Sequence, residues 1–269
     1  MPAETRGLRV TRAVAAGFDG RSAAALHPDL RTFTGDLVRP YGLPLREDLL
    51  AEGAGHDYGE MAAGLFAQAL PGGEPADLLI LAFASPDVRP AAPSSLRLSR
   101  HCPGQPTAFA VCDQGSATAF AALRIAAAHH RTGGCRRAVI VLAEQSALHY
   151  RPAEPVELPT GHRAVVLVCE EAPAAGMRIR QEDRPDGLRA LRSVLDEHRE
   201  LGPGARLLLA AGLAGDGLPE GAEAARPGQP FTGVWSLLAD RLADRSAGGP
   251  LLVADHDRQL GRLSTLTLP

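Results

Sequence analysis

The stretch from Thr107 to Glu144 constrains the fold most, because two apolar strands flank one helix in close succession. The first strand runs from Thr107 to Cys112 and leads into the polar corner Asp113-Gln114-Gly115-Ser116. A helix rich in small residues is expected at about 117–130, and the second strand covers 138–143 and ends at Glu144. Short apolar runs bounded by turn residues are typical of strands buried on both faces of a sheet. The pattern therefore predicts an α/β protein with parallel strands.

The corner before the helix has a definite chemistry. Ser116 lies where the first amides of the helix have no partner within the helix. Those amides and the helix dipole stabilise negative charge. Acyl-transfer enzymes place a nucleophile at such a position. Ser116 is therefore the first candidate catalytic residue, although a serine that only caps the helix is the simpler alternative.

This strand, corner and helix resemble the thiolase superfamily, most closely its ketoacyl-ACP synthase III branch. Members of that branch often read Gln-Gly-Cys at the corner, and here Gln114-Gly115 precede Ser116 in the place of the cysteine. The resemblance implies two βαβαβαββ halves related by a pseudo-twofold axis, stacked as α-β-α-β-α layers. We expect one half at 1–171 and a reduced half at 172–269. The match is strong over 77–170 and weak after Met177.

The rest of the chain is consistent with alternating strands and helices. Turn residues such as Pro71-Gly72-Gly73 divide the segments. Further strands are expected at 8–16, 77–84, 162–170, 177–180, 206–211, 251–254 and 263–268. Helices are expected at 58–70, 94–101, 186–201 and 231–245. The segment 21–52 is expected to be short helix or irregular structure, and loops are expected at 212–229 and 255–261.

Composition excludes several classes of function. The net charge is −3 with charges of both signs mixed along the chain, so nucleic acid is not an expected partner. The apolar runs are too short to span a bilayer and the N-terminus lacks a signal-peptide pattern, so we expect a cytoplasmic protein without membrane contact. The four cysteines show no zinc-ligand spacing and are expected to be buried free thiols. We expect neither a metal nor a cofactor.

The resemblance also implies a Cys-His-Asn triad, and this chain departs from it at all three places. The chain contains no asparagine and no lysine, and all 28 basic residues are arginine. The motif that carries the asparagine corresponds to Pro230-Phe231-Thr232-Gly233, and the strand that ends in the histidine corresponds to 206–211, followed by Gly212-Leu213-Ala214. Decarboxylative condensation by this chain alone is therefore improbable.

A reactive Ser116 would need a general base, and His256 is the best candidate by position. It lies in Asp255-His256-Asp257, which we expect in the turn between the last two strands. That turn reaches the active site in the thiolase fold, and flanking carboxylates could orient an imidazole. A polar turn without catalytic function is the alternative. His149 and His162 could also lie near a pocket, whereas the helix that starts at the corner carries His129 and His130 about 20 Å away.

Two functions remain open. The first is a partner subunit without condensing activity, joined to a full-length ketosynthase (or in a homodimer) through the strand Thr107–Cys112, in polyketide or fatty-acyl specialised metabolism. The second is an active acyltransferase or thioester hydrolase that uses Ser116. An acyl carrier protein or acyl-CoA could meet exposed arginines, for which the candidates are Arg97, Arg100, Arg136 and Arg137. Glu144 corresponds to an acidic family residue, and we expect a structural or pocket-edge role for it.

Overall fold

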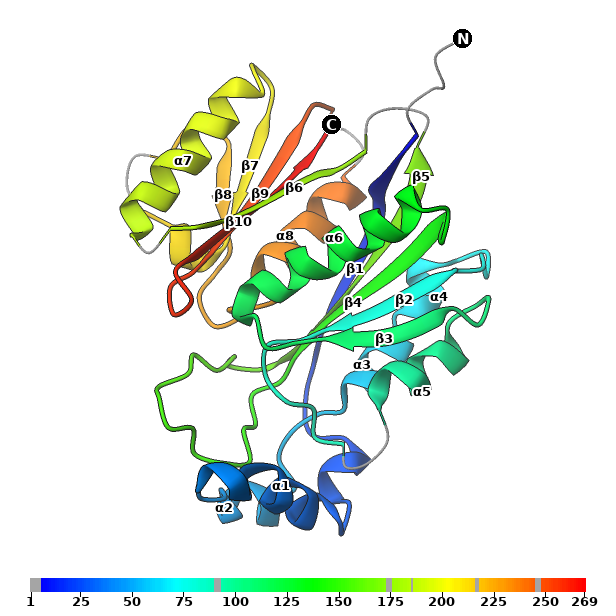
Figure 1. Cartoon of the computed structure of the whole chain (residues 1–269), viewed down its shortest axis with the longest axis vertical. Coiled ribbons are helices and arrows are strands. Elements are labelled where there is room, and N and C mark those ends of the chain that lie inside the picture. The colour runs from blue at the N-terminus through cyan, green and yellow to red at the C-terminus, as the bar shows by residue number, and fades with distance from the viewer. Residues whose placement is uncertain (1–5, 90–92, 173–175, 185, 216–217, 245–247) are drawn as a thin grey trace.

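Two five-stranded sheets form the frame of the molecule (Figure 1). The computed structural model describes residues 6–89, 93–172, 176–184, 186–215, 218–244 and 248–269. The first sheet has the order β1-β5-β4-β2-β3 and contains β1 (Gly7–Phe18), β2 (Leu78–Ala82), β3 (Thr107–Val111), β4 (Arg137–Glu144) and β5 (His162–Ala172). The second sheet has the order β6-β10-β9-β7-β8 and contains β6 (Arg178–Asp183), β7 (Arg206–Leu209), β8 (Ala222–Ala224), β9 (Leu251–Asp257) and β10 (Arg262–Leu268).

The two sheets repeat one topology, since each position of the first sheet has a counterpart in the second. In both, the first strand pairs antiparallel with the last strand, and the second strand (β2 or β7) pairs parallel with the strands on both of its sides. The central strand (β4 or β9) pairs antiparallel with the last strand. Each sheet is built from one half of the chain, with the change between Ala172 and Arg178. The sequence therefore predicted the α/β class and the paired βαβαβαββ order correctly.

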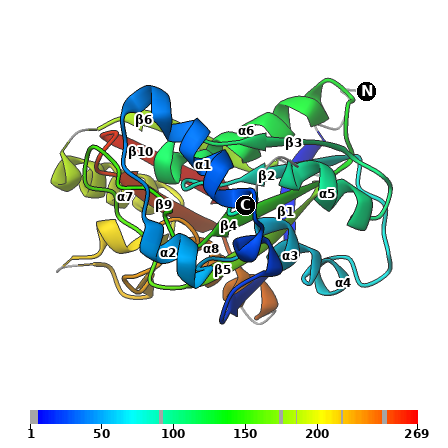
Figure 2. The same cartoon turned by 90° about the horizontal axis from the view of Figure 1, so that it is seen from below.

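Helices complete five layers (Figures 1 and 2). The outer layer on the first sheet contains α3 (Tyr58–Ala63), α4 (Phe66–Ala69) and α5 (Ser94–His101). The middle layer contains α6 (Thr118–Arg131) and α8 (Gly233–Ala243), which contact strands of both sheets. The outer layer on the second sheet is α7 (Gly187–Glu200). Below the first sheet in Figure 1 lie α1 (Leu30–Val38) and α2 (Glu47–Glu52), with the 3-10 helices η1 (Ala23–Leu26) and η2 (Arg39–Tyr41) before and between them.

The second half is reduced at one connection. In the first half, α5 connects β2 to β3, whereas among the described residues between β7 and β8 the only helix is η4 (Ala211–Leu213). The expected loop at 212–229 also contains the short strand β8, which pairs in parallel with β7. The expected helix at 58–70 is two helices, because the turn at Gly64-Leu65 separates α3 from α4.

The main core lies around the middle layer and draws on both halves of the chain. Phe120 of α6 and Trp235 of α8 are fully buried, and their ring centroids are 4.8 Å apart. Side chains of β1, β2, β4 and β5 meet side chains of β7, β9 and β10 in the same cluster. Burial of apolar surface is the main favourable term in folding, so this shared core holds the two halves together. No helix among the described residues has the length and apolarity needed to cross a membrane.

Candidate functional site

Ser116 lies where the first half of the chain meets the second. The corner forms the 3-10 helix η3 (Gly115–Ala117) between β3 and α6, and η3 packs against β9 and β10. The Thr118 hydroxyl donates to the Gly115 carbonyl over 2.8 Å and holds the turn. Ser116 itself is half-buried. The predicted position of this residue at the entrance to a helix is therefore confirmed, while its reactivity stays a prediction.

The backbone N–H of Ser116, which the sequence suggested as a donor to an oxyanion, already donates a hydrogen bond to a carboxylate. The Ser116 N–H donates to Oδ2 of Asp257 over 2.9 Å. The other oxygen of Asp257 accepts the Leu260 N–H over 2.9 Å, so both carboxylate oxygens are held. Gly115 has a φ of +51°, and a side chain there would collide with the Asp257 carboxylate. Glycine at 115 is therefore required by this close approach of β9 as well as by its backbone conformation.

A second carboxyl group, that of Asp255, lies beside the Ser116 side chain. Its burial raises the pKa to about 7, while a hydrogen bond with the Ser116 side chain opposes the rise. The nearby charges of Asp257 and Glu157 raise the pKa further. One carboxyl oxygen of Asp255 is buried and has no hydrogen-bond partner. The surroundings of Ser116 are therefore acidic, whereas a developing oxyanion is stabilised by hydrogen-bond donors or positive charge.

His256 does not share this site with Ser116. Asp255, His256 and Asp257 form the last three residues of β9 and pair with β10, so the prediction that they lie in the turn is wrong. Successive side chains of a strand point to opposite faces. The two aspartates face the middle layer, whereas His256 faces α7, where its Nε2 contacts the carbonyl oxygen of Arg184. A pairing of His256 with Ser116 is therefore not found.

The other candidate histidines also have local partners. The His149 side chain is buried against the Ala54 carbonyl oxygen at 2.9 Å, and burial lowers its pKa. Nδ1 of His162 accepts the Ser146 N–H over 3.3 Å, and its pKa is lowered by burial and by the neighbouring His56. Neither contact involves the Ser116 corner.

Glu144 connects the end of β4 to the start of α8. It is 1% exposed and accepts hydrogen bonds from the Phe231 N–H (3.0 Å), the Thr232 N–H (2.9 Å) and the Thr232 hydroxyl. Burial raises the pKa of Glu144, and these hydrogen bonds together with Arg163 partly offset that rise. The segment that corresponds to the family asparagine motif therefore leads into a helix, and the Glu144 carboxylate holds it there by hydrogen bonds. This arrangement agrees with the structural role expected for Glu144.

The segment that corresponds to the end of the family's histidine-bearing strand also makes a structural contact. Gly212 belongs to η4, which packs against β9. Its carbonyl oxygen accepts a hydrogen bond from Nη2 of Arg258 over 2.8 Å. Neither of these two places presents an imidazole or an amide side chain to the corner.

The arginines expected at a carrier surface divide into two pairs. Arg97 forms an ion pair with the buried Asp57 at 3.0 Å, and Arg137 forms one with Glu170 at 2.8 Å. Arg100 and Arg136 are exposed. No cluster of three or more metal-binding side chains occurs in the part of the chain that the structure describes.

Sequence reasoning missed the two aspartates as neighbours of Ser116, because it treated them as flanks of His256. The alternation of side chains along β9 could have shown which face the two aspartates take. Val253 belongs to the core of the middle layer, whereas Leu252 and Ala254 pack on the side of α7. Continuing that alternation by two residues places Asp255 and Asp257 toward the middle layer and His256 away from it.

Comparisons with known proteins agree with this architecture. No family model and no curated protein sequence matches this chain. Among solved structures, the chain is similar to the priming β-ketosynthase of the R1128 polyketide pathway, with a TM-score of 0.63 and 15% identity over 98% of this chain and 96% of that one. For FabH, the 3-oxoacyl-(acyl carrier protein) synthase III of Pseudomonas aeruginosa, the TM-score is 0.64 with 14% identity over 97% and 98%. For a variant of OleA from Xanthomonas campestris it is 0.63 with 14% identity over 97% of both chains.

TM-scores of 0.63 and 0.64 over nearly the whole chain establish the fold, whereas identities of 14–15% leave the activity open. The strand order, the five layers and the coverage of nearly the whole chain agree with one another. The chain has the thiolase-like fold of the ketoacyl-ACP synthase III-like proteins.

Proposed function

We propose that this chain is a ketosynthase III-like protein that does not catalyse condensation by itself and acts as the partner subunit of a catalytic ketosynthase. Its pathway would be polyketide or fatty-acyl specialised metabolism, because the similar structures include a priming ketosynthase of a polyketide pathway. The assembled pair would bind an acyl carrier protein or acyl-CoA.

The single observation that supports this proposal most is the contact between Asp257 and the Ser116 amide. Acyl transfer develops negative charge on the carbonyl oxygen, and the enzyme must offer donors at that point. Here the donor at the corner already binds a carboxylate at 2.9 Å. An oxyanion would have to displace that carboxylate or lie beside its charge. Both alternatives raise the barrier.

The nucleophile itself adds a second argument. A serine hydroxyl requires a general base within hydrogen-bond reach, whereas a cysteine can react as a thiolate. His256 faces α7, and the candidates His149 and His162 have other partners. A chain of this fold with neither the cysteine nor a neighbouring imidazole is suited to a structural role in a complex.

One observation favours the alternative of an active acyltransferase or thioester hydrolase. The Asp255 carboxyl group interacts with the Ser116 side chain, and its pKa is raised to about 7. A base with a pKa near the working pH is suited to accept the serine proton. In that alternative Asp255 acts as the general base, the role for which the sequence suggested His256.

Mass spectrometry of the intact protein separates the two functions. The chain is incubated with acetyl-CoA, malonyl-CoA, octanoyl-CoA and the matching acyl carrier protein thioesters, and Ser116→Ala is the control. We expect no adduct on the wild-type chain. An adduct on Ser116 that is absent from Ser116→Ala would overturn the proposal in favour of the alternative.

Co-expression with the full-length ketosynthase encoded nearest in the genome tests the partner role. We expect a complex of fixed stoichiometry that catalyses condensation, and we expect Ser116→Ala in this chain to leave the rate unchanged. Loss of the rate in that variant would place catalysis in this chain. A ketosynthase that condenses equally well without this chain would argue against a partner role.

A further inference from the structure

The outer helix α7 changes the chemistry of its packing along its length. Ala190 and Val194 are fully buried and join an apolar cluster with strands of the second sheet. An amphipathic helix would continue this stripe three residues further on. That position is Glu197, whose side chain is only 10% exposed. A carboxylate therefore lies between α7 and the sheet, where an apolar side chain would otherwise close the contact.

Donors from two strands hold Glu197. Nη2 of Arg180 on β6 donates to its carboxylate over 2.6 Å, and the hydroxyl groups of Thr265 and Thr267 on β10 donate over 3.1 and 3.2 Å. Beside this polar layer, between α7 and β6, lies a cavity of about 340 Å³, which is lined by Arg178, Arg180, Ser193, Asp196, Glu197 and Glu200. Sites for small molecules start at about 300 Å³, so this cavity is large enough for one.

Three charged groups of the cavity wall are available to a ligand. Arg178 is 67% exposed, and its ion pair with Glu197 is long, at 3.9 Å. Glu200 has no hydrogen bond or ion pair with any residue that the structure describes. Asp196 uses one oxygen for Arg199. Asp196 and Glu200 are four residues apart, so they are neighbours on the helix surface and their charges repel. The wall therefore offers one cation to a carboxylate and two carboxylates to cations.

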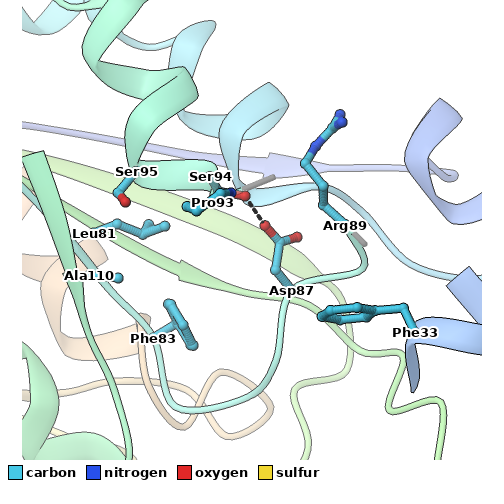
Figure 3. Close-up of a pocket in the computed structure, with 9 residues that line it drawn as sticks. All are labelled: Phe33, Leu81, Phe83, Asp87, Arg89, Pro93, Ser94, Ser95 and Ala110. Atoms are coloured by element: carbon cyan, nitrogen blue, oxygen red, sulfur yellow. Dashed lines mark hydrogen bonds between the residues drawn. The ribbon is translucent and has the colours of Figure 1, made fainter. Parts of the chain in front are cut away.

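A second cavity, of about 280 Å³, lies beside β3 and has a different chemistry (Figure 3). Its carboxyl group, that of Asp87, already accepts the Ser94 hydroxyl and the Tyr58 N–H. Its guanidinium, that of Arg89, forms an ion pair with the buried Asp57. The rest of its wall is mostly carbon, from Phe33, Leu81, Phe83, Pro93 and Ala110. A charged small molecule is therefore suited to the cavity at α7 rather than to this one.

We propose that the cavity between α7 and β6 binds a free α-amino acid with a cationic side chain. The ligand's carboxylate pairs with Arg178, because a guanidinium can donate two parallel hydrogen bonds to a carboxylate. Its ammonium group and its cationic side chain lie against Asp196 and Glu200 and offset the repulsion between them. The site belongs to the outer layer of the second half, whereas Ser116 lies at the middle layer. The inference therefore goes beyond the proposed function and does not depend on it.

Titration with L-arginine tests the site, followed by nitrogen–proton correlation spectra of the isotope-labelled full chain. Two analogues each lack one charge of L-arginine: agmatine has no carboxylate, and L-citrulline has an uncharged ureido group in place of the guanidinium. We expect L-arginine to shift signals of β6 and of the C-terminal half of α7. It should bind at least about threefold more tightly than either analogue, a modest factor because exposed ion pairs are weak.

Variants of the chain assign the contacts. Arg178→Gln should remove the preference for L-arginine over agmatine, and Glu200→Gln should reduce the preference for L-arginine over L-citrulline. Arg192→Gln and Glu154→Gln are the matched controls, because they change the charge in the same way at exposed residues outside the cavity, and both preferences should persist in them. Melting temperatures verify that each variant is folded.

Four results would overturn the inference. The first is the absence of shifts with L-arginine at millimolar concentration, and the second is shifts confined to other parts of the chain. The third is an affinity for agmatine or L-citrulline equal to that for L-arginine. The fourth is a preference over agmatine that Arg178→Gln leaves intact, which would mean that Arg178 does not bind the carboxylate.

Discussion

Asp257 places a carboxylate against the Ser116 backbone amide, which would otherwise be free to stabilise a developing oxyanion. Two unit charges about 4 Å apart interact by about 4 kcal/mol at an effective dielectric constant of 20, so removal of this charge should be measurable. We predict that Asp257→Ala increases the rate of Ser116 acylation by p-nitrophenyl acetate at least tenfold. Intact-mass kinetics give the rate, and Asp257→Ala combined with Ser116→Ala gives the background. Equal rates in the wild type and Asp257→Ala would show that the carboxylate does not restrain this corner.

Asp255 should make stability depend on pH. Its pKa is raised to about 7 in the folded chain, against about 3.9 for an unfolded aspartate. Between these values the folded state binds a proton that the unfolded state has released, so stability falls as pH rises from about 4 to about 7. Urea unfolding at pH 5 and pH 8 should show that Asp255→Asn reduces this fall by roughly 1–4 kcal/mol.

Asp87 provides the comparison for that measurement. Burial and the charge of Asp57 also raise its pKa to about 7, and it lies in a different part of the molecule. Asp87→Asn should therefore remove a separate share of the same pH dependence. If Asp255→Asn leaves the difference between pH 5 and pH 8 unchanged, Asp255 is already ionised in the folded chain at pH 5.

At the scale of single elements, α8 depends on a carboxylate from another element. Glu144 of β4 accepts three hydrogen bonds from Phe231 and Thr232, the two residues that lead into the helix. Glu144→Gln replaces one acceptor oxygen by a donor that faces N–H groups. We predict a loss of about 1.5–3 kcal/mol in the free energy of unfolding, measured with urea at pH 8. Glu154→Gln, at an exposed loop residue, is the control and should change stability little.

The elements were largely predictable, because their signals are local. The apolar runs predicted β2 and β4, and the helix α5 was predicted with its observed bounds. The end of β9 was not predictable from residue types, because Asp and His are common in turns and only pairing with β10 extends the strand to Asp257. The contact of Asp257 with Ser116 joins residues 141 positions apart in the sequence, so no local pattern reports it.

At the scale of the whole molecule, the two sheets share one core. Phe120 from the first half packs on Trp235 from the second, and Trp235 is the only tryptophan. We predict that unfolding in urea followed by Trp235 fluorescence coincides with unfolding followed by far-ultraviolet circular dichroism, because neither half buries its face of the middle layer alone. Two separate transitions would show that the halves fold independently. A fragment of residues 1–171 should correspondingly fail to give a cooperative transition.

The open edge of β3 has a consequence for how the protein is produced. This edge exposes an uncharged strand of five residues, which is suited to pair with the same strand of other chains. Its yield in native form should therefore fall as its concentration during synthesis rises, and the excess chain should accumulate as aggregates. The rate at which the chain is synthesised would then be as important for this molecule as any residue near Ser116.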